Sequence, residues 1–111
     1  MTVVTTVAEL LAAFRPVAAA MLTPREFRAA EFWVHVDGRE RLRRVPEDDV
    51  VHEGMVLGWS IAGDDGDSWL WLGEGERELL FKIADDLQDF IAESAFAWGE
   101  LRPIPPLGQE R

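Results

Sequence analysis

Three aspartates within four residues, Asp64, Asp65 and Asp67, carry carboxylates at a spacing that could hold a metal ion. Calcium-binding loops place oxygen ligands at alternating positions and close with a more distant glutamate. Asp65 and Asp67 alternate in this way, but Trp69 occupies the position where the next ligand is required. The spacing therefore predicts a polar hairpin turn at this point and no metal site.

A second set of possible metal ligands lies earlier in the chain: Asp48, Asp49, His52 and Glu53. A helical turn would bring side chains three and four residues apart together. Pro46 and Gly54 bracket the segment, however, and indicate a loop. His35, on a predicted strand, is the other histidine, and two histidines with loop carboxylates are a common chance combination.

Nucleophilic catalysis has little support in this sequence. The chain contains neither cysteine nor tyrosine, and no strand-turn-helix glycine pattern surrounds Ser60, Ser68 or Ser94. No glycine-rich loop has a phosphate-binding pattern. Carboxylates are so abundant that no pair of them indicates acid–base catalysis. We therefore expect no catalytic residue and no cofactor.

Tryptophan is unusually frequent, with five in 111 residues: Trp33, Trp59, Trp69, Trp71 and Trp98. One interpretation is core packing, in which each indole N–H finds a hydrogen-bond partner. The other is an aromatic patch on an uncovered sheet face, of the kind that protein interfaces use. The sequence leaves both open.

The charge is strongly negative and unevenly distributed. The net charge is −10, and residues 64–93 hold ten acidic residues against Arg77 and Lys82, a net charge of −8. Such a surface does not suit direct binding to nucleic acid, which needs basic side chains. It favours a basic protein partner, or it serves solubility alone. The one basic run, RERLRR at 39–44, is typical of a solvated edge strand, although it could grip an acidic partner.

Two helices are predicted before the sheet. Thr6 with Glu9 forms a capping-box pattern at the start of a helix over residues 7–21, whose apolar residues recur at helical spacing. Pro16 lies inside this pattern and is expected to kink or split the helix. Thr23 with Glu26 marks a second, short helix.

Four strands are predicted, over residues 31–36, 39–45, 55–62 and 68–72. Asp37-Gly38 is the expected turn of the first hairpin. Residues 63–67 are the expected loop of the second hairpin, so that Ala62 pairs with Ser68. This register places Ile61 beside Trp69 and Trp59 beside Trp71 on one face of the sheet.

A long helix is predicted over residues 77–98, with Gly99 as its C-terminal cap. Its expected apolar stripe consists of Leu80, Ile83, Leu87, Phe90, Ile91 and Trp98. Its expected wet face carries Asp85, Asp86, Asp89 and Glu93. The proline-rich residues 101–111 are expected to be extended and unpaired.

These elements predict an α+β fold: a two-layer sandwich of about four antiparallel strands, with the N-terminal helix and the long C-terminal helix on one face. Residues 1–100 form the single domain and residues 101–111 the tail. The first residues lack the basic region of a secretion signal, and no apolar run is long enough to span a membrane. We therefore expect a cytoplasmic protein.

The block MVLGWSIAGDDGDSWLWLGEGERELLFKIADDLQDFIAES resembles small bacterial α+β proteins in which a tryptophan-bearing hairpin leads into one long acidic helix. The size, acidity and lack of cysteine are also similar to those of immunity proteins that neutralise toxins. The resemblance implies a non-enzymatic inhibitor of a basic toxin or nuclease, and it assigns no role to a particular residue. An alternative is a small-ligand or enzymatic domain, with a pocket between sheet and helices lined by His35 or His52.

The partner-binding residues predicted from charge and aromatic character come from the second hairpin and the long helix: Asp64, Asp65, Asp67, Trp69, Trp71, Asp85, Asp86 and Asp89.

Overall fold

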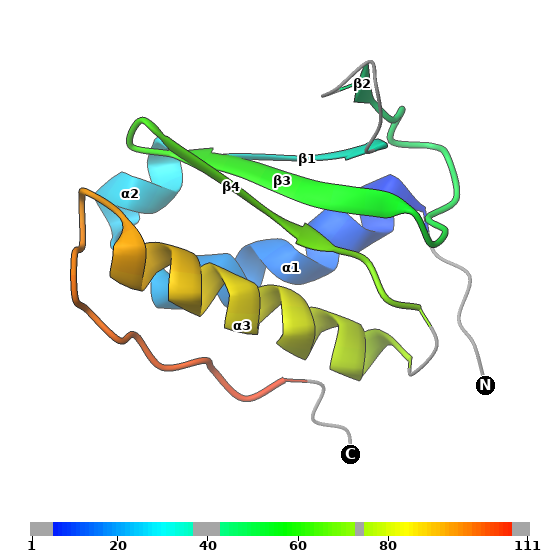
Figure 1. The fold of residues 1–111 in the computed structure, drawn as a ribbon. Coiled ribbons are helices and arrows are strands. Elements are labelled where there is room, and N and C mark those ends of the chain that lie inside the picture. The colour runs from blue at the N-terminus through cyan, green and yellow to red at the C-terminus, as the bar shows by residue number, and fades with distance from the viewer. Residues whose placement is uncertain (1–5, 37–42, 73–74, 108–111) are drawn as a thin grey trace.

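The computed structural model describes residues 6–36, 43–72 and 75–107 and shows an α+β protein (Figure 1). Its elements in chain order are α1 (Val7–Met21), α2 (Pro24–Arg28), β1 (Glu31–Val36), β2 (Arg43–Arg44), β3 (Met55–Ile61), β4 (Asp64–Trp69) and α3 (Glu76–Glu93). The strands form an antiparallel sheet in the order β2-β1-β3-β4. Helices α1 and α3 lie on the same side of this sheet.

The sheet has three strands of ordinary length, which is fewer than the four predicted. Strands β1, β3 and β4 have six or seven residues, whereas β2 has two, Arg43 and Arg44, paired with Val36 and His35. The predicted Asp37-Gly38 turn and the first part of the predicted return strand, residues 39–42, lie outside the described residues.

Helix α1 begins and ends where the sequence predicts. The Thr6 Oγ1 accepts the Glu9 backbone N–H at 3.1 Å, and the Glu9 carboxylate accepts the Thr6 N–H at 2.9 Å. The expected split at Pro16 does not occur, because α1 continues through it. A proline costs one backbone hydrogen bond, but buried side chains anchor the helix on both sides of it, from Val7 to Met21.

The β3–β4 hairpin differs from the predicted one in its turn and in its register. The turn consists of Ala62 and Gly63, with φ of 52° and 91°, so β4 already begins at Asp64. Two positive φ values give a tight turn whose twist matches that of the flanking strands. Trp59 therefore pairs with Gly66, and the predicted pairs of Ile61 with Trp69 and Trp59 with Trp71 are wrong.

Helix α3 ends at Glu93, five residues before the predicted end at Trp98. Ser94 has an extended backbone, and its hydroxyl donates to the Ile91 carbonyl at 2.7 Å while accepting the Ala97 N–H at 3.1 Å. A serine hydroxyl that satisfies backbone groups in this way competes with the helix. Trp98 consequently lies outside the apolar stripe, on a loop.

The core fills the space between the sheet and the two long helices. The predicted stripe residues Leu80, Ile83, Leu87 and Ile91 are all buried, which confirms the inward face of α3. Trp59 and Phe14 are the largest fully buried side chains. Among the described ranges, no helix combines the length and apolarity needed to cross a membrane.

Residues 101–107 form neither helix nor strand, but they contact the rest of the domain through hydrogen bonds and a buried side chain (Figure 1). The Arg102 guanidinium donates to the Met21 carbonyl at 3.1 Å and to the Glu26 carboxylate at 2.6 Å. Gln88 on α3 donates to the Arg102 carbonyl at 2.8 Å. Leu107 is buried against the core. Residues 101–107 are therefore part of the packed structure.

Candidate protein-interaction surface

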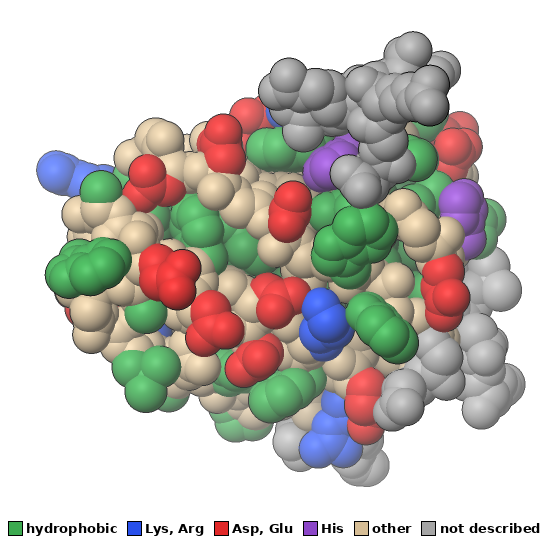
Figure 2. All heavy atoms as spheres, in the orientation of Figure 1, with side chains coloured by type: hydrophobic (Ala, Val, Ile, Leu, Met, Phe, Trp, Pro, Cys, Tyr) green, Lys and Arg blue, Asp and Glu red, His purple; other side chains and the backbone are tan. Residues whose placement is uncertain are grey.

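Acidic side chains from β4 and α3 gather on one face of the molecule (Figure 2). Strand β4 is an edge strand, and α3 packs beside it. Glu76 and Glu78, in the first turn of α3, are exposed, and the five further exposed carboxylates of these two elements are those of Asp65, Asp67, Asp85, Asp89 and Glu93. We call these five residues the acidic face. The fold thus brings together acids that are up to 28 positions apart in the sequence.

Two of the predicted binding acids have structural partners within the domain. Asp86 Oδ2 accepts the Ser68 hydroxyl at 2.5 Å and the Lys82 ammonium at 2.8 Å. Asp64 Oδ2 accepts the Ala95 N–H at 2.8 Å. The Asp86 carboxylate therefore links β4 to α3, and the Asp64 carboxylate links β4 to the segment after α3. Both residues are partly buried.

The two predicted binding tryptophans border the acidic face. Trp69 is 50% exposed and Trp71 62% exposed. Trp69 shares the outer face of β4 with Asp65 and Asp67, because side chains two residues apart in a strand point to the same face of the sheet. The Lys82 ammonium lies 3.5 Å from the Trp69 carbonyl, and Lys82 lines a shallow hollow beside Trp71. This corner therefore contains a cation, unlike the rest of the face.

Trp33, on the outer face of the sheet, is already occupied by contacts within the chain. Its indole lies over Gly58 of the neighbouring strand, at a place where a β-carbon would be 2.9 Å from the ring. The Arg44 guanidinium lies over the Trp33 ring at 4.4 Å from the ring centroid and pairs with Glu31 at 3.2 Å. Trp33 is thus a structural residue at this edge.

Trp59, on the inner face of the sheet, also packs over a glycine of the neighbouring strand. It lies over Gly66 of β4, and its ring meets Phe90 of α3 edge to face at 5.6 Å. The expectation that each indole N–H finds a partner is wrong for Trp33 and Trp59, whose buried Nε1 atoms have none.

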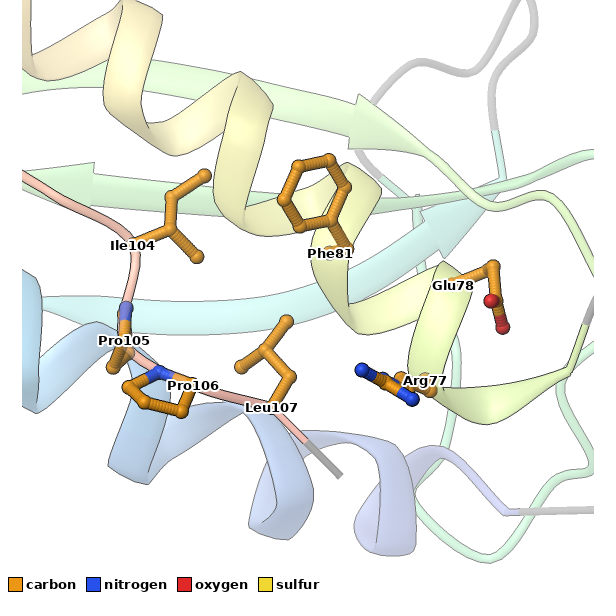
Figure 3. Close-up of a pocket in the computed structure, with 7 residues that line it drawn as sticks. All are labelled: Arg77, Glu78, Phe81, Ile104, Pro105, Pro106 and Leu107. Atoms are coloured by element: carbon orange, nitrogen blue, oxygen red, sulfur yellow. The ribbon is translucent and has the colours of Figure 1, made fainter. Parts of the chain in front are cut away.

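The surface has hollows near both ends of α3. One, of about 480 Å³, lies between Phe81 and the tail residues Ile104 and Leu107, which border the same space (Figure 3). A second, of about 620 Å³, lies beyond the C-terminal end of α3. Neither they nor the hollow at Trp71 are lined by His35 or His52. The buried side chains between sheet and helices belong to the core instead.

The other candidates from the sequence contribute little to a site. His52, Asp48, Asp49 and Glu53 are exposed on the loop before β3, where the His52 Nδ1 lies 3.0 Å from the Glu53 carbonyl. Over the described ranges, no three histidine or acidic side chains lie close enough to hold a metal ion. The RERLRR run lies mostly outside the described residues.

Two residues of this surface were missed by sequence reasoning. Glu93 was assigned only to the wet face of the helix, and Trp98 to the core. The sequence Ser94-Ala95 could have indicated that Trp98 lies after the helix, because a serine in the last helical turn can end the helix. Nothing in the sequence pattern distinguished Glu93 from the other helix acids.

Comparisons with protein families, with curated proteins and with solved structures found no match for this chain.

Proposed function

We propose that this protein is a non-enzymatic binding module whose acidic face contacts a basic protein. The observation that carries the proposal is that the carboxylates of the acidic face are not used internally. Within the described part of the chain, the salt bridges involve Glu26, Glu31, Asp86 and Glu100, and none of the five residues of the acidic face. A surface of one sign without internal counter-charges suits a partner of the opposite sign.

The two kinds of side chain on this surface have different roles in the proposed complex. Carboxylates at the surface accelerate encounter with a basic protein, because long-range attraction steers the two molecules together. Exposed tryptophans such as Trp69 and Trp71 supply apolar contact area that keeps the complex together. Binding of this kind needs neither a catalytic residue nor a cofactor.

The partner class that we infer is a basic toxin or nuclease, which this protein would neutralise by covering a positively charged surface. The proposal rests on the acidic face together with the resemblance to immunity proteins in size, acidity and the tryptophan-bearing hairpin. An inhibitor acts by occupying a surface, so an acidic face without catalytic residues is sufficient for it.

The first experiment is complex formation with the purified product of the neighbouring gene, measured by size-exclusion chromatography and by association kinetics. Asp85→Asn with Asp89→Asn should slow association and flatten its dependence on salt, while the melting temperature stays unchanged. Both side chains are exposed, so their neutralisation leaves the core intact.

The matched control is Asp48→Asn with Glu53→Gln, which changes the net charge by the same amount on the loop before β3. This control should associate at nearly the unmodified rate. If both double variants slow association equally, net charge and not the acidic face governs encounter. If neither changes it, α3 lies outside the interface.

A further inference from the structure

A groove of about 620 Å³ lies at one end of the acidic face, between the start of β4 and the segment after α3. Figure 1 shows the β3–β4 turn and the segment after α3 at the same end of the molecule. Its lining comes from the start of β4 and from the end of α3 and the following loop: Asp64, Asp65, Phe90, Glu93, Ser94, Ala95 and Trp98. Asp65 and Glu93 bring two exposed carboxylates, and Trp98 and Phe90 bring aromatic rings. The groove is therefore both aromatic and negatively charged.

Trp98 projects into solvent from a loop that is held by many hydrogen bonds. It is 76% exposed, the most exposed of the large apolar side chains described. Its neighbours are fixed: Ala97 donates to the Ser94 hydroxyl at 3.1 Å, and Gly99 donates to the Ala92 carbonyl at 2.8 Å. Asp64 fixes the Ala95 end of the same loop. A rigidly held, exposed tryptophan has the properties of an anchor at a protein interface.

A contact elsewhere in this protein shows that an arginine can bind an indole and a carboxylate together. On the outer face of the sheet, the Arg44 guanidinium stacks on Trp33 and pairs with the Glu31 carboxylate. The groove likewise combines an indole with carboxylates, and the described residues supply no arginine to stack on Trp98.

We propose that this groove receives an arginine side chain of the basic partner, with the guanidinium over the Trp98 indole and directed to the carboxylates of Asp65 and Glu93. Arginine fits better than lysine, because its planar guanidinium stacks on aromatic rings and donates to carboxylates in a fork. The inference rests on the proposed function, and it adds the chemistry of the side chain that is recognised.

A peptide probe tests the groove without the natural partner. The probe is a blocked nonapeptide with three arginines separated by glycine and serine, and its control carries citrulline in place of each arginine, which removes the charge and keeps the length. Titration is followed by the ¹H–¹⁵N spectrum of the protein, including the five indole N–H signals. The arginine peptide should shift the Trp98 indole and the amides of residues 64, 65 and 93–98, and the citrulline peptide should not.

Variants then locate the binding. Trp98→Leu should weaken binding of the arginine peptide about tenfold, in line with the strength of a partly desolvated cation–π contact. Phe81→Leu is the matched control, because Phe81 is also an exposed aromatic side chain but lines the hollow near the other end of α3. Glu93→Gln should weaken binding, whereas Glu76→Gln, at the other end of α3, should leave it unchanged.

The outcomes separate this inference from the proposed function. Shifts confined to Asp85 and Asp89 with an unmoved Trp98 overturn the arginine groove and leave the acidic face in place. Equal shifts with the citrulline peptide, or equal loss in the Phe81→Leu control, also overturn it. If the arginine peptide shifts the groove but the neighbouring gene's product forms no complex, the groove stands and the proposed partner class falls.

Discussion

Gly58 and Gly66 show how single residues decide where the tryptophans of this sheet lie. Each glycine is covered by the indole of the strand beside it, Trp33 on the outer face and Trp59 on the inner face. Because glycine has no side chain, the indole of the neighbouring strand has space to pack over it and covers the glycine backbone. Cross-strand pairs of this kind fix register, because a slip by one residue moves each side chain to the other face.

The two glycines should differ in their response to substitution. In Gly66→Ala the new β-carbon would lie 2.5 Å from Nε1 of the fully buried Trp59 and 2.6 Å from Phe90, which is partly buried and packs against the core. We expect a loss of about 1–3 kcal/mol of unfolding free energy, which is typical of overpacking. Gly58→Ala, the matched control, meets only Trp33 at 2.9 Å on the open face, and should cost clearly less. Chemical denaturation measures both, and equal losses would contradict this packing.

Glu26 and Arg102 form a largely buried ion pair, with side chains 14% and 17% exposed. The hydrogen bond from Arg102 lowers the pKa of Glu26 below its ordinary value of 4.5. A carboxyl group whose pKa is lower in the folded state stabilises the fold above its unfolded pKa, and this contribution is lost as the pH falls through the folded pKa.

Glu26→Gln should therefore cost about 1–3 kcal/mol at neutral pH, the usual size for a hydrogen bond to a charged group. Glutamine can still complete the capping box with Thr23, so the substitution isolates the charge. The difference in unfolding free energy between the two proteins should shrink as the pH is lowered below 4.5. A difference that stays constant between pH 7 and pH 3 would mean that the ion pair does not contribute.

At the scale of elements, the helix starts and the buried faces could be predicted, whereas strand register and helix ends could not. The capping boxes at Thr6 and Thr23 are local patterns, and they begin helices where expected. The turn at Ala62-Gly63 was hidden by the more polar sequence that follows, because Asp64 and Asp65 resemble turn residues while serving in an edge strand. At the end of α3, the Ser94 hydroxyl is joined by Asp64, which accepts the Ala95 N–H in a contact between distant parts of the chain.

Leu87 tests the inward face of α3. It is completely buried in the core cluster, so Leu87→Ala should lower the unfolding free energy by about 2–5 kcal/mol, as truncation of buried leucines does. Asp85→Ala on the exposed face of the same helix is the control, and it should change stability by less than about 0.5 kcal/mol. Equal effects in thermal or chemical denaturation would contradict the burial.

For the molecule as a whole, the net negative charge of residues 64–93 was a better guide to the surface than the roles predicted for individual acidic residues. Asp65, Asp67, Asp85 and Asp89 are all exposed, and they lie near one another because α3 packs beside β4. The roles of Asp64 and Asp86 could not be foreseen, since each depends on a donor brought close only by the fold. The same holds for Arg102, which looked like part of a detached tail.

The position of Asp65 and Asp67 on an edge strand has a consequence for self-association. An exposed edge offers unpaired backbone groups to the edge of a second copy, and charged side chains along it keep two copies apart by mutual repulsion. Neutralising both aspartates would remove this protection from β4. A variant with Asp65→Asn and Asp67→Asn should therefore dimerise or aggregate through β4 more readily than the unmodified chain, a change that concentration-dependent light scattering would detect.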